Sequence, residues 1–93
     1  MQKNKIYSVS SIAEQLTKIK LKKKKILMCH GVFDLLHIGH IKYFKEAKSL
    51  GDILVVTITP DKYVNKGPGR PAFNEKLRAE AISALEVVDF VAI

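Results

Sequence analysis

The chain has 93 residues and a mass of 10.4 kDa, which is enough for one small domain, and its formal charge at pH 7 is +7. Hydrophobic residues make up 47% and charged residues 27%, a balance typical of a folded domain, which excludes a largely disordered chain. The single cysteine, Cys29, excludes a disulfide scaffold, and neither a signal segment nor a run of about 20 apolar residues is visible, so we expect a cytoplasmic protein without a membrane segment.

The whole excess of positive charge lies at the N-terminal end. Residues 1–25 carry eight lysines and one acidic residue, Glu14, whereas the basic and acidic side chains of residues 26–93 balance. The run from Lys18 to Lys25 therefore allows one alternative function, the binding of nucleic acid or another anionic surface, although it lacks aromatic side chains for base stacking. We divide the chain into an N-terminal helix and basic linker, residues 1–25, and a main domain, residues 26–93.

Hydrophobic periodicity predicts elements that alternate along the chain. The first is a helix at about 11–21, for which Ser11 and Glu14 form a capping-box pattern. Strands and helices joined by short connections predict an α/β fold, a Rossmann-like parallel sheet with helices on both faces, which binds ligands at the carboxyl ends of its strands. The elements expected after the first helix are a buried strand at 26–30, a helix at 39–50, a strand at 53–59, a loop at 60–73, a helix at 74–85 with Leu77, Ala81, Ala84 and Leu85 inward, and a strand at 87–93.

The first candidate site lies between the strand at 26–30 and the helix that follows it. His37 and His40 are three residues apart where this helix begins, so both rings can lie on one face of its first turn. Free backbone N–H groups and the helix dipole favour a bound anion there, and Gly39 leaves room for the backbone to approach it. The pattern predicts a phosphate site.

Two other interpretations fit the same histidines. In the first, one histidine caps the helix and the other is an ordinary surface residue. In the second, they belong to a zinc site, because the ligand types are present in Cys29, His30, His37 and His40. Cys29 and His30 are neighbours on a strand, however, and their side chains point to opposite faces, so they cannot easily share one ion.

The residues at this junction resemble a known family. Segment 31–40, Gly-Val-Phe-Asp-Leu-Leu-His-Ile-Gly-His, and segment 47–52, Ala-Lys-Ser-Leu-Gly-Asp, are similar to the nucleotidyltransferase superfamily with the His-x-Gly-His motif. Two branches are close, glycerol-3-phosphate cytidylyltransferase and the adenylyltransferase domain of ADP-heptose synthase. Segment 66–71 resembles the heptose branch more, whereas His30 and Val32 depart from the asparagine and the cysteine common in that branch.

The resemblance implies the transfer of a nucleoside monophosphate from ATP or CTP to a phosphorylated sugar or polyol, with release of pyrophosphate, in the synthesis of cell-envelope polysaccharide precursors. It implies that His37 and His40 are catalytic and donate hydrogen bonds to phosphate oxygens, and that Mg²⁺ arrives with the triphosphate. It also implies that Asp34 orders the turn. The implied nucleotide-binding residues are Gly31, Val32, Phe33, Asp34, Ile38, Gly39, Asp61 and Arg78.

The loop at 60–73 and the helix after it supply fixed cations. Lys66 and Arg70 are candidates for binding substrate phosphate, since lysine is a mobile point charge and arginine a planar fork. Arg78 lies in the first turns of its helix, where a cation is unfavourable unless an anion lies nearby. Solvated surface charge is the alternative for all three. Asp61 lies at the same sheet edge, where it either contacts the nucleotide or caps a turn.

The resemblance also implies elements that these 93 residues lack. Family members continue for several more elements and carry a serine- and threonine-rich motif that binds the triphosphate, and no such motif occurs here. We therefore expect a sheet that is incomplete at the C-terminus, with an apolar edge left open after the strand at 87–93. A fragment that binds a nucleotide without turning it over is the second alternative function, and a homodimer is consistent with the family.

Overall fold

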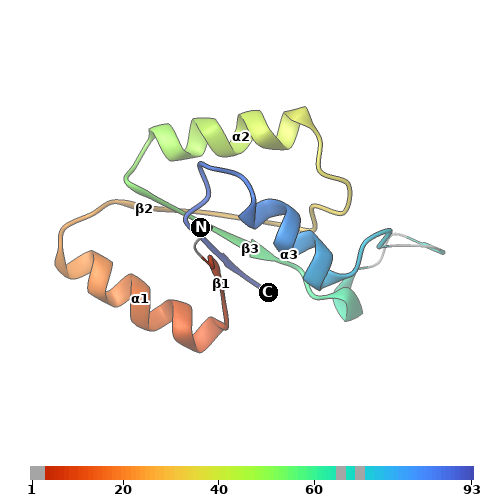
Figure 1. The fold of residues 1–93 in the computed structure, drawn as a ribbon, viewed down its shortest axis with the longest axis horizontal. Helices are drawn as coiled ribbons and strands as arrows, with labels where there is room; N and C mark the ends of the chain where they lie inside the picture. The colour runs from red at the N-terminus through yellow and green to blue at the C-terminus, as the bar shows by residue number, and fades with distance from the viewer. Residues whose placement is uncertain (1–3, 65–66, 69–70) are drawn as a thin grey trace.

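The structure, a computed structural model, describes residues 4–64, 67–68 and 71–93. Helices α2 and α3 lie on one side of a parallel sheet and α1 lies on the other (Figure 1), which confirms the predicted Rossmann-like α/β fold. The sheet has the strand order β1-β4-β3-β2. The elements are β1 (Ile6–Tyr7), α1 (Val9–Leu21), β2 (Ile26–Gly31), α2 (Ile38–Ser49), β3 (Ile53–Ile58), the 3-10 turn η1 (Asp61–Tyr63), α3 (Glu75–Ser83) and β4 (Phe90–Ala92).

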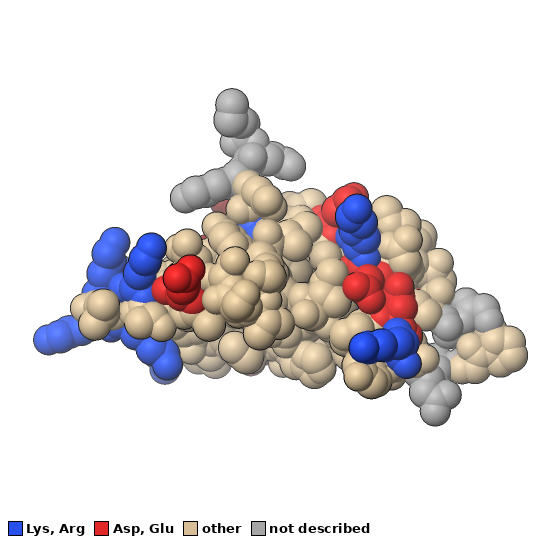
Figure 2. All heavy atoms as spheres, turned by 90° about the horizontal axis from the view of Figure 1, so that it is seen from below, with Lys and Arg blue, Asp and Glu red and all other residues tan. Residues whose placement is uncertain are grey.

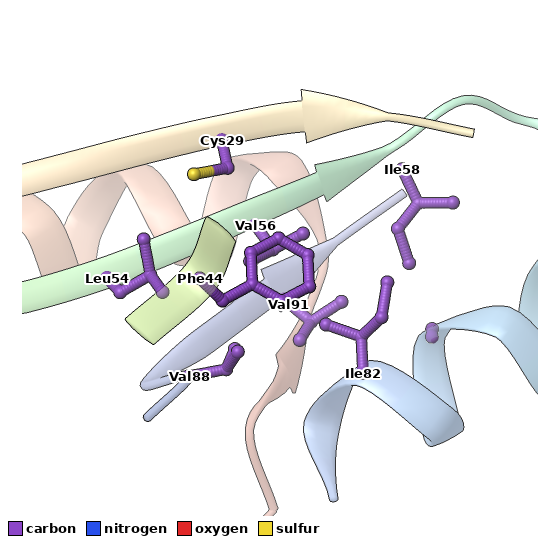
Figure 3. Packing of buried hydrophobic residues seen from close by; sticks show 9 residues of the cluster. Cys29, Phe44, Leu54, Val56, Ile58, Ile82, Val88 and Val91 are labelled. Carbon is purple, nitrogen blue, oxygen red and sulfur yellow. The ribbon is translucent and has the colours of Figure 1, made fainter. Parts of the chain in front are cut away.

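The alternation of side chains along the strands divides the core into two layers. β3 lies between β2 and β4 and is covered on both faces, which explains why its sequence is apolar almost without interruption. On the face toward α1, Val55 and Ala92 pack against Ile12. On the opposite face, drawn in Figure 3, the strands, the helices and the connection before β4 contribute Cys29, Phe44, Leu54, Val56, Ile58, Ile82, Val88 and Val91.

The first strand, β1, was not predicted from the sequence. It contains only Ile6 and Tyr7, which is too short for a readable alternation, and it pairs in parallel with Val91 and Ala92 of β4. β4 therefore lies between β1 and β3, so the expectation of an open edge beside the last strand is wrong. The N-terminal segment, expected as a helix and a linker, also adds a strand to the sheet.

The prediction of a buried strand at 26–30 is wrong in part. β2 is the edge strand of the described sheet, and Met28 is 60% exposed whereas Cys29 is buried. The reason is that α2 covers one face of β2, while on the other face α1 packs mainly over β1 and β4 and only Ile26, at the start of β2, joins the cluster around Ile12. The open edge of the sheet is therefore at β2.

Helix α1 begins at Val9, two residues before the start predicted at residue 11. Ser8, not Ser11, is its N-cap, and the Ser8 hydroxyl accepts a hydrogen bond from the Ser11 amide at 3.2 Å. The Ser11 and Glu14 pair is therefore not the capping box.

The C-terminal elements are shorter than predicted, and α3 buries a different face. α3 ends at Ser83 and β4 begins at Phe90, so the residues between them form turns rather than helix and strand. The buried face of α3 carries Arg78, Ala79 and Ile82, and Leu77 is half exposed. Periodicity failed here because a charged residue occupies a core position.

The lysines that follow one another near the end of α1 lie together at one end of the molecule. Lys18, Lys20 and residues 22–25 are exposed at the end of α1, and Figure 2 shows blue side chains grouped at that end of the visible face. β2 begins there and runs toward the opposite end, where α2 starts (Figure 1). In the described part of the chain, no helix is long and apolar enough to cross a membrane.

The capping of α1 gives a stability test. We expect Ser8→Ala to lower the free energy of unfolding by about 1 kcal/mol, because the Ser11 amide loses its acceptor. Ser11→Ala should change it by less than about 0.5 kcal/mol, because its hydroxyl bonds only at the surface. Urea unfolding followed by circular dichroism measures both values. A larger cost for Ser11→Ala would contradict the observed helix start.

Candidate functional site

Two connections that are distant in sequence meet at the carboxyl ends of the strands. The Thr59 amide donates to the Gly31 carbonyl at 3.0 Å, just beyond the last β2–β3 pair. The buried Asp34 carboxylate accepts hydrogen bonds from the Ala72 amide at 2.9 Å and the Phe73 amide at 3.1 Å. The connection after β2 and the one after β3 are therefore joined, as the fold class predicts.

His37 and His40 cap the start of α2 together. His37 is the N-cap, and its Nδ1 accepts from the Gly39 amide at 3.0 Å, while His40 Nδ1 accepts from the His37 amide at 3.2 Å. The two rings stack with centroids 3.9 Å apart and planes 29° apart. The prediction that both rings lie on one face of the first turn is confirmed. The two histidines also cap the helix, so capping does not exclude their lying together.

The capping hydrogen bonds at Nδ1 determine what Nε2 of each histidine can do. A neutral imidazole whose Nδ1 accepts a hydrogen bond carries its proton on Nε2, so each ring can act as an Nε2–H donor. The Gly39 amide bonds to His37 Nδ1 and the His40 amide bonds to the His37 carbonyl. The sequence led us to expect free N–H groups of this turn to bind an anion, whereas these two are occupied. The imidazoles add side-chain donors at this turn.

Tight packing fixes the rings from two directions. A Cβ added to Gly39 would lie 2.7 Å from His37 Cε1, so only glycine leaves room for this ring position. Phe33 has a φ of 51°, a left-handed conformation unusual for a bulky residue. Its ring meets His40 edge-on at 5.4 Å and Phe44 at 5.1 Å, so side-chain packing holds the strained residue in place.

Arg78 is buried and crosses between the two connections. Its side chain is fully enclosed, with Nη2 paired to Asp61 Oδ1 at 2.6 Å. Nη1 donates to the Val32 carbonyl at 2.8 Å and Nε to the Phe73 carbonyl at 3.1 Å. All three nitrogens are thus satisfied by the chain. The alternative of a solvated surface charge does not describe Arg78.

The remaining predicted residues divide by position. Gly31, Val32, Phe33 and Ile38 lie in or beside the connection after β2, and Ile38 is 65% exposed. Asp61 begins η1, and its amide donates to Glu75 Oε1 at 2.9 Å, a contact that sequence reasoning missed. A hollow of about 340 Å³ adjoins this region and is lined by Phe33, Asp34, Leu36, Phe73, Leu77, Arg78 and Ala81. Two predicted phosphate-binding residues, Lys66 and Arg70, lie outside the described residues.

Sequence reasoning also gave no role to a polar group on the α1 side of the sheet. His30 Nδ1 lies 2.7 Å from Thr57 Oγ1, and His30 Nε2 lies 3.4 Å from Thr59 Oγ1. The available signal was the pair of threonines that interrupts an apolar strand at alternate positions.

The arrangement of possible metal ligands bears on the zinc interpretation. Cys29 faces α2, and a hydrogen bond with its side chain raises the pKa of the Tyr43 phenol above its usual range. His30 lies on the opposite face of β2 and contacts Thr57. Within residues 4–64, 67–68 and 71–93, no group of three or more histidine, cysteine or acidic residues could hold a metal ion.

These features define an α/β protein with a pair of histidine donors at the carboxyl edge of a parallel sheet, the position at which such folds bind phosphorylated ligands. Comparison with known families agrees: a model described as cytidylyltransferase-like matches residues 28–92. The chain belongs to this family, and the resemblance seen in the motif is confirmed.

Individual proteins within this family are similar to the chain. The chain is 42% identical over 91 residues to a protein named bifunctional protein HldE from Geobacter metallireducens, and 46% identical over 87 residues to one of the same name from Campylobacter jejuni subsp. doylei. These matches cover 96% and 91% of this chain but 19% of each relative, so the chain spans about a fifth of their length. The crystal structure of a lipopolysaccharide core biosynthesis protein from Thermoplasma volcanium matches with a TM-score of 0.69 and 45% identity, over 74% of this chain and 57% of that one.

The substitution Gly39→Ala should change the position of the His37 ring without lowering the stability of the fold. We expect the His37 ring to move, because a Cβ would overlap it, whereas alanine favours the helix by up to about 1 kcal/mol over glycine. The ring signals in a ¹H–¹³C spectrum and the urea midpoint measure the two effects. An unmoved His37 signal would show that the ring position does not depend on glycine.

Arg78→Met should be strongly destabilising. We expect the free energy of unfolding to fall by about 2–4 kcal/mol, because Asp61 loses its cation and two carbonyls lose their donor. Lys76→Met removes an exposed cation from the same helix and should cost less than about 0.5 kcal/mol. Equal effects of the two substitutions would refute the structural role of Arg78.

Proposed function

We propose that the chain forms part of a nucleotidyltransferase that moves a nucleoside monophosphate from ATP or CTP to a phosphorylated sugar or polyol and releases pyrophosphate. The observation that carries the proposal is the His37–His40 pair, which orients two Nε2 donors at the start of α2. Membership of the cytidylyltransferase-like family supports the same reaction class.

The names of the relatives support a choice of acceptor. The Thermoplasma volcanium structure is described as a lipopolysaccharide core biosynthesis protein, and HldE proteins match nearly the whole chain. We therefore place the reaction in the synthesis of cell-envelope polysaccharide precursors, with a sugar phosphate as acceptor. Both nucleotides remain candidates, and the binding test below chooses between them.

The reaction needs placement and charge stabilisation rather than an activated side chain. An oxygen of the acceptor phosphate attacks the α-phosphorus, the bond from this phosphorus to the α,β-bridging oxygen breaks, and pyrophosphate leaves with those electrons. In this proposal His37 and His40 donate Nε2–H hydrogen bonds to the phosphate oxygens on which negative charge increases. Stacking and capping hold both rings in advance, which reduces the entropy lost when the substrates align.

Asp34, Asp61 and Arg78 act as positioning residues in this proposal. Arg78 fixes the Val32 carbonyl, and Asp34 fixes the backbone at Ala72 and Phe73. These contacts hold the connection that carries the histidines against the start of α3.

Mg²⁺ is part of the proposal as the companion of the triphosphate. The nearby carboxylates are engaged, Asp34 by backbone amides and Asp61 by Arg78. This donor set fits an ion held mainly by phosphate oxygens and water, which is the usual preference of Mg²⁺. When bound, the ion would neutralise charge on the triphosphate.

Calorimetric titration of the chain with the α,β-methylene analogues of ATP and CTP, with Mg²⁺ present, tests the proposal. We expect one analogue to bind, and His40→Ala to weaken it at least about 10-fold through loss of one charged hydrogen bond. Ser49→Ala, at the far end of α2, is the matched control and should bind normally. The proposal would be rejected if neither analogue binds. It would also be rejected if His40→Ala binds the analogue as tightly as the unchanged chain does.

The lysine-rich end provides an independent test of where the nucleotide binds. Lys22→Glu combined with Lys24→Glu should leave affinity for the triphosphate analogue within about 2-fold at 0.15 M salt, because these residues lie at the other end of the sheet and are screened. Loss of affinity by more than 10-fold would instead favour the alternative of a basic anion-binding surface.

A further inference from the structure

The carboxyl end of β2 carries a second polar cluster, on the face of the sheet opposite to α2. His30 pairs in register with Thr57 on β3, and Thr59 follows at the end of that strand. Their side chains lie together: His30 Nδ1 is 2.7 Å from Thr57 Oγ1, and His30 Nε2 is 3.4 Å from Thr59 Oγ1. We call these three residues the His30 cluster.

The cluster is accessible because α1 does not reach it. Helix α1 packs on the β1 and β4 side of this face, where Ile12 meets Val55 and Ala92. On the same face of β2, Met28 is 60% exposed and His30 is exposed as well. A polar group thus stands on an open part of the sheet, beside an exposed apolar side chain.

The two hydrogen bonds of the imidazole have different strengths. The contact with Thr57 is short and orients the ring, whereas the 3.4 Å contact with Thr59 is near the limit for a hydrogen bond. A ligand hydroxyl can replace the weaker partner at little cost. Imidazole and two hydroxyls together offer both donors and acceptors, which suits a polyol better than a simple anion.

The position relates the cluster to the histidine pair. His30 directly precedes Gly31, and Thr59 donates its amide to the Gly31 carbonyl. Gly31 ends β2 and begins the connection that leads to His37 and His40. The cluster and the histidine pair therefore both belong to the carboxyl edge of the sheet, where they lie toward its two faces.

We infer that the His30 cluster is the acceptor subsite and that it binds the hydroxyl groups of the phosphorylated sugar or polyol. This inference rests on the proposed function, which requires two phosphorylated substrates to meet at this edge. His30, Thr57 and Thr59 are then specificity-determining residues that select the acceptor. They do not contact the triphosphate.

Ring spectra test the inference without requiring turnover. The chain has three histidines, so ¹H–¹³C ring signals can each be assigned with one His→Ala variant. The probes are glycerol 3-phosphate, mannose 1-phosphate, inorganic phosphate and, separately, the α,β-methylene analogues of ATP and CTP with Mg²⁺. We expect at least one polyol phosphate to shift the His30 signal, inorganic phosphate to leave it unchanged, and a triphosphate analogue to shift the signals of His37 and His40.

Variants identify the contacts. His30→Ala and Thr59→Val should each weaken binding of the responding polyol phosphate about 10-fold or more, the value expected for one lost hydrogen bond. Met28→Ala, two residues earlier on the same face, is the matched control and should change it less than about 3-fold. Affinity for the triphosphate analogue should not change in any of the three.

The outcomes separate the two hypotheses. If a triphosphate analogue shifts His37 and His40 but no polyol phosphate shifts His30, the acceptor subsite is rejected and the proposed function stands. If a polyol phosphate shifts His30 but neither analogue shifts His37 or His40, a polyol-phosphate site at the His30 cluster is supported, whereas the proposed function, and with it the acceptor role of that site, is rejected. An equal His30 shift with inorganic phosphate would overturn recognition of hydroxyl groups.

Discussion

The ion pair of Arg78 with Asp61 is the interaction on which the site depends. A guanidinium buried in the core has to be satisfied at every nitrogen, and here the partners come from both connections at the sheet edge. Satisfying the charge thus requires the connection after β2 to lie against the start of α3. The buried Asp34 carboxylate joins the same two segments through backbone amides.

This constraint prepares the start of α2 for chemistry. Phe33 is held in a left-handed conformation between Gly31 and the rings of His40 and Phe44. The histidine side chains then accept hydrogen bonds from the amides of His37 and Gly39, and each ring can present an Nε2–H donor. An imidazole donor reaches farther than a backbone amide. Such a turn suits a triphosphate that must be held while a second phosphate approaches.

Much of the fold could be predicted from the sequence, because β3 and α2 carry clear periodic patterns and the order of elements determines a parallel sheet. β1 could not be predicted, since two residues show no alternation and pair only through tertiary contact. The histidine pair was predictable because a helix start brings residues three apart onto one face. The role of Arg78 was not, since a charged side chain in a core position depends on partners 17 and 46 residues away.

A crystal structure of the chain with Mg²⁺ and whichever α,β-methylene triphosphate analogue binds tests the central claim most directly. We expect phosphate oxygens within about 3 Å of Nε2 of His37 and His40, with Arg78 still bonded to Asp61 and the Val32 carbonyl. An Arg78 side chain that leaves Asp61 to bind the phosphates directly would refute its positioning role, and a triphosphate bound away from the start of α2 would refute the role of the histidine pair.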